Sequence, residues 1–111
     1  GGSISPGFQS RYKILSEDSK KLPFLKYKIP DVIIGDSTEN SIHSGIYFGV
    51  FSEIEYQIQF YSKKYKNLIV IVTGGDSQIL SKSLKNRIFA NQNFLAEGLN
   101  YLLELKKLKL Y

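Results

Sequence analysis

The sequence has no cysteine and no methionine, and it has a single histidine, His43. Without cysteine the chain has no disulfide framework and no thiolate metal site. One histidine is too few for a zinc site, and a Ser-His-Asp triad would have to use His43 itself. We expect His43 to be exposed to solvent, because its neighbours in sequence are polar. These absences argue against disulfide-rich and zinc-dependent proteins, and they predict no metal ligands in this chain.

Arginine is also scarce. The formal net charge is +5, but thirteen of the fifteen positive residues are lysine and only Arg11 and Arg87 are arginine. Arginine is the residue that reads guanine edges and stacks on bases. Because the lysines are scattered, we interpret them as solvated surface, with a basic nucleic-acid-binding domain as an alternative. Arg11 could approach a phosphate or pair with a carboxylate such as Glu17 or Asp18.

Long apolar runs are missing as well. None approaches the roughly 20 residues that a membrane helix requires. The first residues show neither the charged region nor the apolar region of a signal peptide. The chain begins without methionine and with turn-like residues, so we expect it to be the C-terminal portion of a longer protein. We expect a cytoplasmic protein with no membrane partner and no nucleic-acid partner.

The residues that are present describe one folded domain, with 111 residues and 42% hydrophobic side chains. Its centre is residues 68–76, L-I-V-I-V-T-G-G-D, which predict a strand buried on both faces and followed by a Gly-Gly turn. Asp76 then stands at the start of a helix predicted over residues 77–84, where it could cap that helix. A strand, a glycine turn and a helix can present backbone N–H groups to a nucleotide, or they can form a tight connection without a ligand.

Three further helices are predicted. The first begins with Ser5 as N-cap before Pro6 and ends near Lys20. The longest runs from about Thr38 to Tyr65 and is capped by one of residues 36–38. It carries a broad apolar stripe made of Ile42, Ile46, Val50, Ile54 and Ile58, widened by Tyr47, Phe51, Phe60 and Tyr61. The last begins near Phe94, after a loop at residues 91–93, and has a leucine core stripe and a frayed tail at residues 106–111.

Two segments of the chain leave alternatives open. Residues 24–29 alternate between polar and apolar side chains and lie between prolines, which predicts an edge strand or an ordered loop. A small-residue face on the longest helix, made of Ser41, Ser44, Gly45 and Gly49, predicts close packing. The packed element could be another helix, a partner subunit or a ligand, and packing is favoured because helix-interior glycine is costly.

Four short motifs, taken together and in order, resemble the C-terminal half of type III pantothenate kinases. They cover almost the whole chain, and they are Gly1-Gly2-Ser3-Ile4-Ser5-Pro6-Gly7 followed by Arg11, Gly35-Asp36-Ser37-Thr38, Thr73-Gly74-Gly75-Asp76, and Gly98-Leu99-Asn100. The resemblance implies an α/β fold: the ribonuclease H-like half of an actin-like ATPase, with helices packed on a small sheet. Residues 1–111 would be that C-terminal domain, with the N-terminal domain absent from this chain.

The resemblance also implies chemistry. Such enzymes move the γ-phosphoryl group of ATP to pantothenate in the first step of coenzyme A biosynthesis. They use Mg²⁺ and a monovalent cation, K⁺ or NH₄⁺, and they are homodimers. By position, Thr73, Gly74, Gly75 and Asp76 resemble the adenosine-side motif, Gly1 and Gly2 belong with Gly7 to the turn after a phosphate motif, and Thr38 matches a pantothenate contact.

The family's catalytic motifs, D-x-G-N-T, G-x-D-R and D-x-G-T-A, do not occur in these 111 residues. Phosphoryl transfer depends on positioning and charge neutralisation, so we expect no catalytic residue in this chain and no activity from it alone. The alternative within this resemblance is a non-catalytic homologue that acts as an accessory transcription factor, which would lack the general base.

Overall fold

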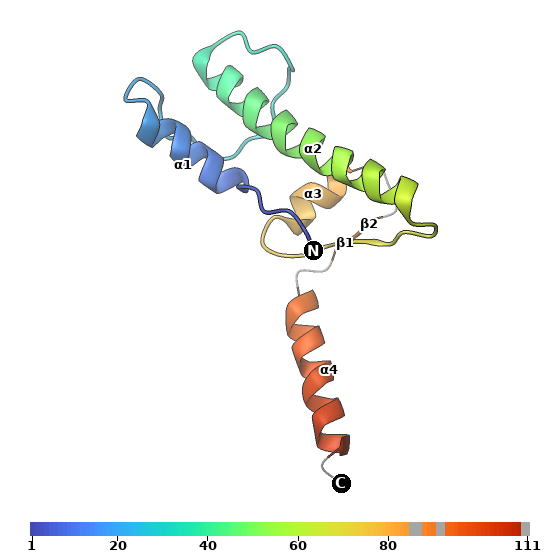
Figure 1. Cartoon of the computed structure of the whole chain (residues 1–111). Helices are drawn as coiled ribbons and strands as arrows, with labels where there is room; N and C mark the ends of the chain where they lie inside the picture. The colour runs from blue at the N-terminus through green and yellow to red at the C-terminus, as the bar shows by residue number, and fades with distance from the viewer. Residues whose placement is uncertain (85–87, 91–92, 110–111) are drawn as a thin grey trace. The chain divides into compact units, whose positions relative to one another are not determined.

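The computed structural model describes residues 1–84, 88–90 and 93–109. The elements are α1 (Phe8–Asp18), α2 (Thr38–Lys64), β1 (Val70–Val72), α3 (Ser77–Ser83), β2 (Ile88–Ala90) and α4 (Phe94–Lys109), as Figure 1 shows. The fold is therefore α/β and mostly helical, as predicted. Residues 1–57 and 58–111 form two compact units. In the described part of the chain no helix is long and apolar enough to cross a membrane.

Helix α1 begins later and ends earlier than predicted. Gly7, not Ser5, occupies the N-cap position, and no side chain caps the helix. Ser5 is instead held by Arg11, whose guanidinium donates to its hydroxyl. The helix ends at Asp18 because Ser19 is extended. Residues 24–29 form no strand, so of the two alternatives the loop is confirmed.

Helix α2 starts at Thr38, as predicted, because its first turn is well capped. The Asn40 backbone N–H donates to the Ser37 hydroxyl over 3.1 Å, which makes Ser37 the N-cap. The Asn40 amide also donates to the Asp36 carboxylate over 2.6 Å. Glu39 in the first turn and two lysines in the last turn suit the helix dipole. Ser37 therefore caps α2, and the Thr38 hydroxyl takes no part in capping.

Gly35 allows the chain to pass directly against this first turn. A Cβ at residue 35 would collide with the Ser41 backbone, its nitrogen lying 2.6 Å away. Gly45, by contrast, has no neighbouring atom within 4 Å of an added Cβ. The two glycines thus serve different purposes, since only Gly35 is required by close packing.

We expect Gly35→Ala to lower the free energy of unfolding by about 1–3 kcal/mol, since the added methyl must displace backbone. Gly45→Ala is the matched control. It adds the same methyl into open space within a helix and should raise stability by up to about 1 kcal/mol. Urea denaturation of the complete protein followed by far-UV circular dichroism measures both. Equal effects of the two substitutions would contradict the close approach at Gly35.

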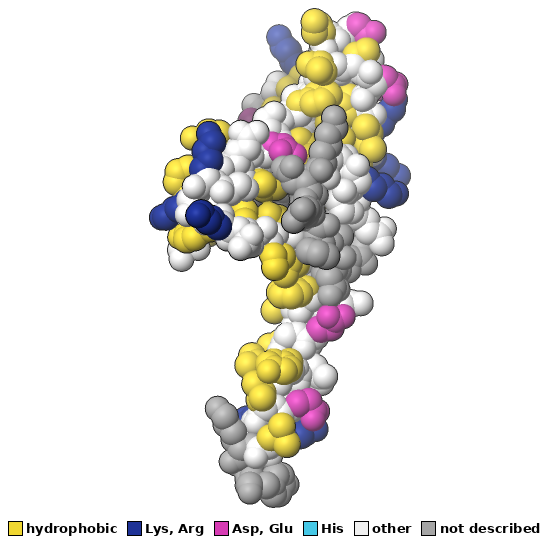
Figure 2. Space-filling view, turned by 90° about the vertical axis from the view of Figure 1, so that its right-hand side faces the viewer, with side chains coloured by type: hydrophobic (Ala, Val, Ile, Leu, Met, Phe, Trp, Pro, Cys, Tyr) yellow, Lys and Arg dark blue, Asp and Glu magenta, His cyan; other side chains and the backbone are white. Residues whose placement is uncertain are grey.

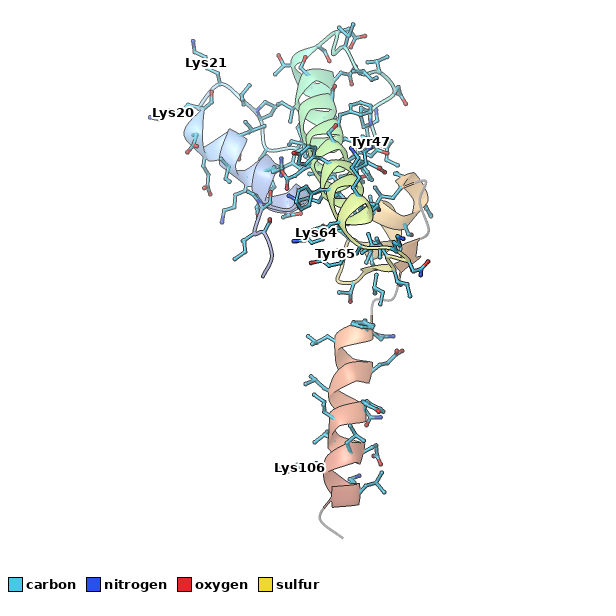
Figure 3. The ribbon with its side chains drawn as sticks, turned by 45° about the vertical axis from the view of Figure 1, so that its right-hand side comes forward. Lys20, Lys21, Tyr47, Lys64, Tyr65 and Lys106 are labelled. Atoms are coloured by element: carbon cyan, nitrogen blue, oxygen red, sulfur yellow. The ribbon has the colours of Figure 1, made fainter. Side chains whose placement is uncertain are left out.

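Helices α1 and α2 lie side by side and antiparallel in the unit of residues 1–57 (Figures 1 and 3). Phe8 at the start of α1 faces Phe51, with ring centroids 6.1 Å apart, while Tyr12, one turn later, faces His43. From the loop between the helices, the Tyr27 ring packs edge-on against Phe8 at 4.9 Å. The predicted apolar stripe of α2 is largely confirmed: Ile42, Ile46, Val50, Phe51 and Ile58 are buried, Ile54 and Tyr47 are half-buried, and Phe60 and Tyr61 are exposed.

Residues 58–111 contain a strand, helix and strand unit. β1 and β2 pair in parallel, with Ile71 opposite Phe89, and α3 connects them. The predicted order of strand, glycine turn and helix is confirmed. The predicted burial of β1 on both faces is wrong: Ile69 and Ile71 are 67% and 44% exposed. The sheet described here has two strands, and the layers packed on it are too few to bury both of its faces. Strand β2 was not predicted.

Helix α4 begins at Phe94, as predicted, but its leucine stripe is not part of a core in the described residues. Leu95, Leu99, Leu102 and Leu103 are all exposed, and Figure 2 shows hydrophobic side chains along this helix. The helix continues to Lys109, so most of the expected frayed tail is helical. Residues 91–92 of the predicted loop and residues 110–111 of the tail lie outside the described residues.

The lysine doublets are exposed and lie on separate elements. Lys20 and Lys21 follow α1, Lys63 and Lys64 end α2, and Lys106 and Lys107 lie on α4. Figure 3 shows Lys20, Lys21, Lys64 and Lys106 in these places. The Lys64 ammonium lies 5.4 Å from the centre of the Tyr65 ring. Their distribution agrees with the interpretation of these lysines as solvated surface.

Candidate functional site

A cavity of about 670 Å³ lies between α1 and α2, within residues 1–57. Most of its wall is apolar, and its polar contributions come from few side chains. It is lined by Arg11, Ile14, Leu15, Leu22, Thr38, Ser41, Ile42, Gly45 and Ile46. A cavity of this size, apolar with a few polar groups, is typical of a small-molecule site. Sequence reasoning found Thr38 but missed the apolar wall, because Ile14, Leu15 and Leu22 looked like ordinary core residues.

Thr38 lies at this cavity as the first residue of α2. Because Ser37 caps the helix, the Thr38 hydroxyl is not needed for capping. Within residues 1–84 and the other described segments, no hydrogen bond holds this hydroxyl. Ser41, one turn further along α2, lines the same cavity. Thr38 therefore has a hydroxyl at the cavity wall that is available to a ligand.

The small-residue face of α2 is only partly packed. Ser44 is buried and donates to the Ile33 carbonyl. An added Cβ at Gly49 would lie 3.5 Å from Nη1 of Arg11. Gly45 is exposed and lines the cavity instead. At Gly45 no other element among the described residues packs against this face, so of the three alternatives packing within the chain is not found there, and a partner subunit or a ligand stays a prediction.

Arg11 pairs with Glu53 on α2. Its Nη2 lies 3.0 Å from Glu53 Oε2, and the same nitrogen donates to Ser5 Oγ over 3.0 Å. Its Nε donates to the Pro6 carbonyl over 2.8 Å. Of the two alternatives for Arg11, the structure shows pairing with a carboxylate, but the carboxylate is that of Glu53 and not that of Glu17 or Asp18. Helical side chains lean toward the N-terminus, so Arg11 reaches back to residues 5 and 6.

These contacts lower the pKa of the Glu53 carboxyl. A hydrogen bond from Ser5 and, next, one from Arg11 hold the pKa of the Glu53 carboxyl below its usual value. The lowered pKa means that the ionised form is favoured in the folded protein. The resulting stability is present above the ordinary pKa of a glutamate and is lost as the pH falls through the lowered pKa.

His43 is buried, so its predicted exposure is wrong. It is 5% exposed and Tyr12 is 2% exposed, and Tyr12 Oη lies 2.6 Å from His43 Nδ1. The missed signal was spacing, because His43 shares a helical face with Ile46 and Val50 at i+3 and i+7. Burial raises the pKa of Tyr12, opposed by a hydrogen bond from the Lys28 backbone. This contribution to stability is complete below the ordinary pKa of tyrosine and is lost as the pH rises through the raised value.

The second group of predicted site residues, Thr73 to Asp76, forms one exposed turn between β1 and α3. Gly74 has a φ of +98°, which favours glycine, and its carbonyl accepts from the Ser77 backbone N–H over 3.2 Å. Asp76 occupies the N-cap position of α3, but its side chain makes no capping bond. The expectation that Asp76 caps α3 through its carboxylate is therefore wrong. The carboxylate takes no part in capping, and it lies next to an exposed glycine turn.

Gly1 and Gly2 lie in the exposed N-terminal segment, with no atom within 4 Å of an added Cβ. They and Thr38 belong to residues 1–57, whereas Thr73 to Asp76 belong to residues 58–111. Among the described residues no cluster of three or more His, Asp or Glu side chains could hold a metal ion.

Comparison with known proteins decides the family. The family model described as "Type III pantothenate kinase" matches residues 1–60, more than half of the chain. This chain belongs to the type III pantothenate kinase family. The match includes α1, most of α2, the cavity between them and Thr38.

Individual relatives agree. A protein named "Type III pantothenate kinase" from Christiangramia forsetii is 52% identical over 107 residues, 96% of this chain and 44% of that protein. Proteins of the same name from Flavobacterium psychrophilum and Cytophaga hutchinsonii are 47% and 41% identical, over 96% and 93% of this chain and 44% of each. The chain thus spans less than half the length of these type III pantothenate kinases.

Proposed function

We propose that the complete protein is an ATP-dependent kinase that phosphorylates pantothenate, the first step of coenzyme A biosynthesis. The observation that carries the proposal is membership of the type III pantothenate kinase family. In this proposal residues 1–111 form the C-terminal ribonuclease H-like domain of an actin-like ATPase fold. This chain supplies contacts to both substrates and none of the catalytic residues.

The cavity between α1 and α2 suits the pantothenate side of the reaction. Pantothenate carries a dimethyl group in its middle and hydroxyl, amide and carboxylate groups around it. The isoleucine and leucine side chains of the cavity offer an apolar wall, while the available Thr38 hydroxyl can donate to an amide or carboxylate oxygen. We infer that Thr38 orients pantothenate, as its position in the family motif implies.

The glycine turn of residues 73–76 suits the nucleotide side. Gly74 and Gly75 have no side chains and are exposed, with no neighbouring atoms within 4 Å of an added Cβ. A nucleotide could therefore approach the backbone there closely. We infer that Thr73, Gly74, Gly75 and Asp76 form an adenosine-side wall. As a separate inference, Gly1 and Gly2 in residues 1–57 contact nucleotide phosphate, as their position in the family motif implies.

The remaining parts of the proposal concern partners outside this chain. Mg²⁺ would neutralise charge on the transferring phosphoryl group, and a monovalent cation would accompany it. Among the described residues no group of three or more His, Asp or Glu side chains could hold a metal ion. The metal sites are thus not assigned to this chain. We also propose that the protein is a cytoplasmic homodimer.

Pantothenate-dependent release of ADP by the complete protein tests this function. With Mg²⁺ and K⁺ present, we expect turnover that requires pantothenate and yields a phosphorylated product detectable by mass spectrometry. Omission of either cation is the control, and it should reduce the rate. A folded protein that binds ATP but releases no ADP with pantothenate would point to the non-catalytic homologue.

A further inference from the structure

The N-terminal segment, residues 1–7, is attached to the helices mainly through one side chain. All seven residues are exposed and form neither helix nor strand. Arg11 donates to the Pro6 carbonyl over 2.8 Å and to the Ser5 hydroxyl over 3.0 Å. Three residues after Ser5 the chain enters α1 at Phe8. The direction in which residues 1–7 leave α1 therefore depends on Arg11.

Glu53 on α2 holds Arg11 in turn. Its Oε2 lies 3.0 Å from Arg11 Nη2, and it also receives a hydrogen bond from Ser5, which lowers the pKa of its carboxyl. Ser5, Arg11 and Glu53 thus form a closed triangle between the N-terminal segment, α1 and α2. Charge-assisted hydrogen bonds are stronger than neutral ones, so the triangle fixes the segment better than a single contact would.

Gly49, one turn before Glu53 on α2, leaves room for the guanidinium. A Cβ there would be in van der Waals contact with Arg11 Nη1, at 3.5 Å. A Cβ at this distance makes an ordinary contact, so Gly49 lies beside the guanidinium without being required by it.

The same contacts argue against Arg11 as a phosphate ligand. Its charge is matched by Glu53, and its Nε and Nη2 are directed at protein oxygens. Arg11 also lines the cavity between α1 and α2. Its chemistry is therefore that of a structural tie between two helices and a loop.

We propose that Glu53, acting through Arg11 and Ser5, is a positioning residue for the nucleotide: it sets the path of residues 1–7 and so places Gly1 and Gly2. This inference rests on the proposed nucleotide contact of these glycines. Glu53 lies far from them in sequence and does not itself touch the substrate in this account.

Glu53→Gln in the complete protein tests the proposal, because glutamine keeps the shape of the side chain and removes its charge. We expect the Kd for ADP, measured by calorimetry, and the KM for ATP to rise about fivefold to tenfold, as expected for lost hydrogen bonds to a charged group. The KM for pantothenate should rise less than the KM for ATP, because of these three residues only Arg11 lines the cavity assigned to pantothenate. Ser5→Ala should behave like Glu53→Gln, and Ser5→Thr, which retains the hydroxyl, should restore binding.

Glu17→Gln is the matched control. Glu17 is an exposed glutamate that pairs with Lys13, at 3.8 Å on the surface of α1, so its loss should leave both nucleotide constants unchanged. An unchanged Kd for ADP in Glu53→Gln, or equal rises in the KM of both substrates, would overturn the positioning role. If the wild-type protein binds ADP with an affinity that depends on Glu53 but does not phosphorylate pantothenate, the proposed function fails and the positioning role stands. If it binds no nucleotide, both fail.

Discussion

Phe8→Ala is expected to lower the free energy of unfolding by about 3–5 kcal/mol, the largest effect of any single substitution considered for this chain. Phe8 is 3% exposed. It joins three parts of residues 1–57, because its ring packs on Tyr27 from the loop and lies against Phe51 on α2. Alanine would remove the ring and leave a cavity that these rigid aromatic neighbours cannot fill.

Phe24→Ala provides the comparison, since the same atoms are removed from a ring that is 57% exposed. We expect a change of less than about 1 kcal/mol there. Urea denaturation of the complete protein, followed by far-UV circular dichroism, measures both variants. Equal losses from the two phenylalanines would show that the contact of α1 with α2 is not the core of this unit.

The sequence predicted the helices well because their signals are local. Residues 38–64 carry an apolar residue every four positions and a capping serine just before them, and both are properties of the helix itself. The glycine turn at residues 73–76 was likewise visible, since Gly74 takes a positive φ that few other residues adopt.

The interactions that depend on another element were not predicted. The buried state of His43 depends on Tyr12 from α1, and the partner of Arg11 lies 42 residues away on α2. Local reasoning favoured a solvated histidine, and for Arg11 it offered a phosphate or a nearby carboxylate such as Glu17 or Asp18 without choosing between them. The predicted start of α1 was wrong for the same reason. Ser5 forms hydrogen bonds with Arg11 and Glu53 and does not cap the helix.

The residues of the candidate site also fall into a group that was predicted from local sequence and a group that was not. Thr38, Gly1, Gly2 and residues 73–76 were found through their motifs, and their roles remain proposals. The apolar wall of the cavity was not found, since a leucine or isoleucine that lines a cavity has the same sequence pattern as one that fills a core. Only the placement of α1 against α2 distinguishes the two.

Thr38→Val is expected to reduce kcat/KM for pantothenate about 10-fold to 100-fold, as expected when one hydrogen bond to a substrate is lost. Valine keeps the size and branching of threonine but has no hydroxyl. Because Ser37 caps α2, the loss should not arise from a weakened helix. The KM for ATP should change by less than about twofold, since the proposed role of the Thr38 hydroxyl is a contact to pantothenate and not to the nucleotide.

The most direct test of the account is therefore the KM for pantothenate in Thr38→Val, compared with Thr38→Ser, which keeps the hydroxyl, in the complete protein with Mg²⁺ and K⁺. We predict that valine raises this KM strongly, that serine leaves it near the wild-type value, and that both variants unfold at the wild-type urea concentration. A wild-type KM for pantothenate in Thr38→Val would contradict the assignment of the cavity between α1 and α2 to pantothenate.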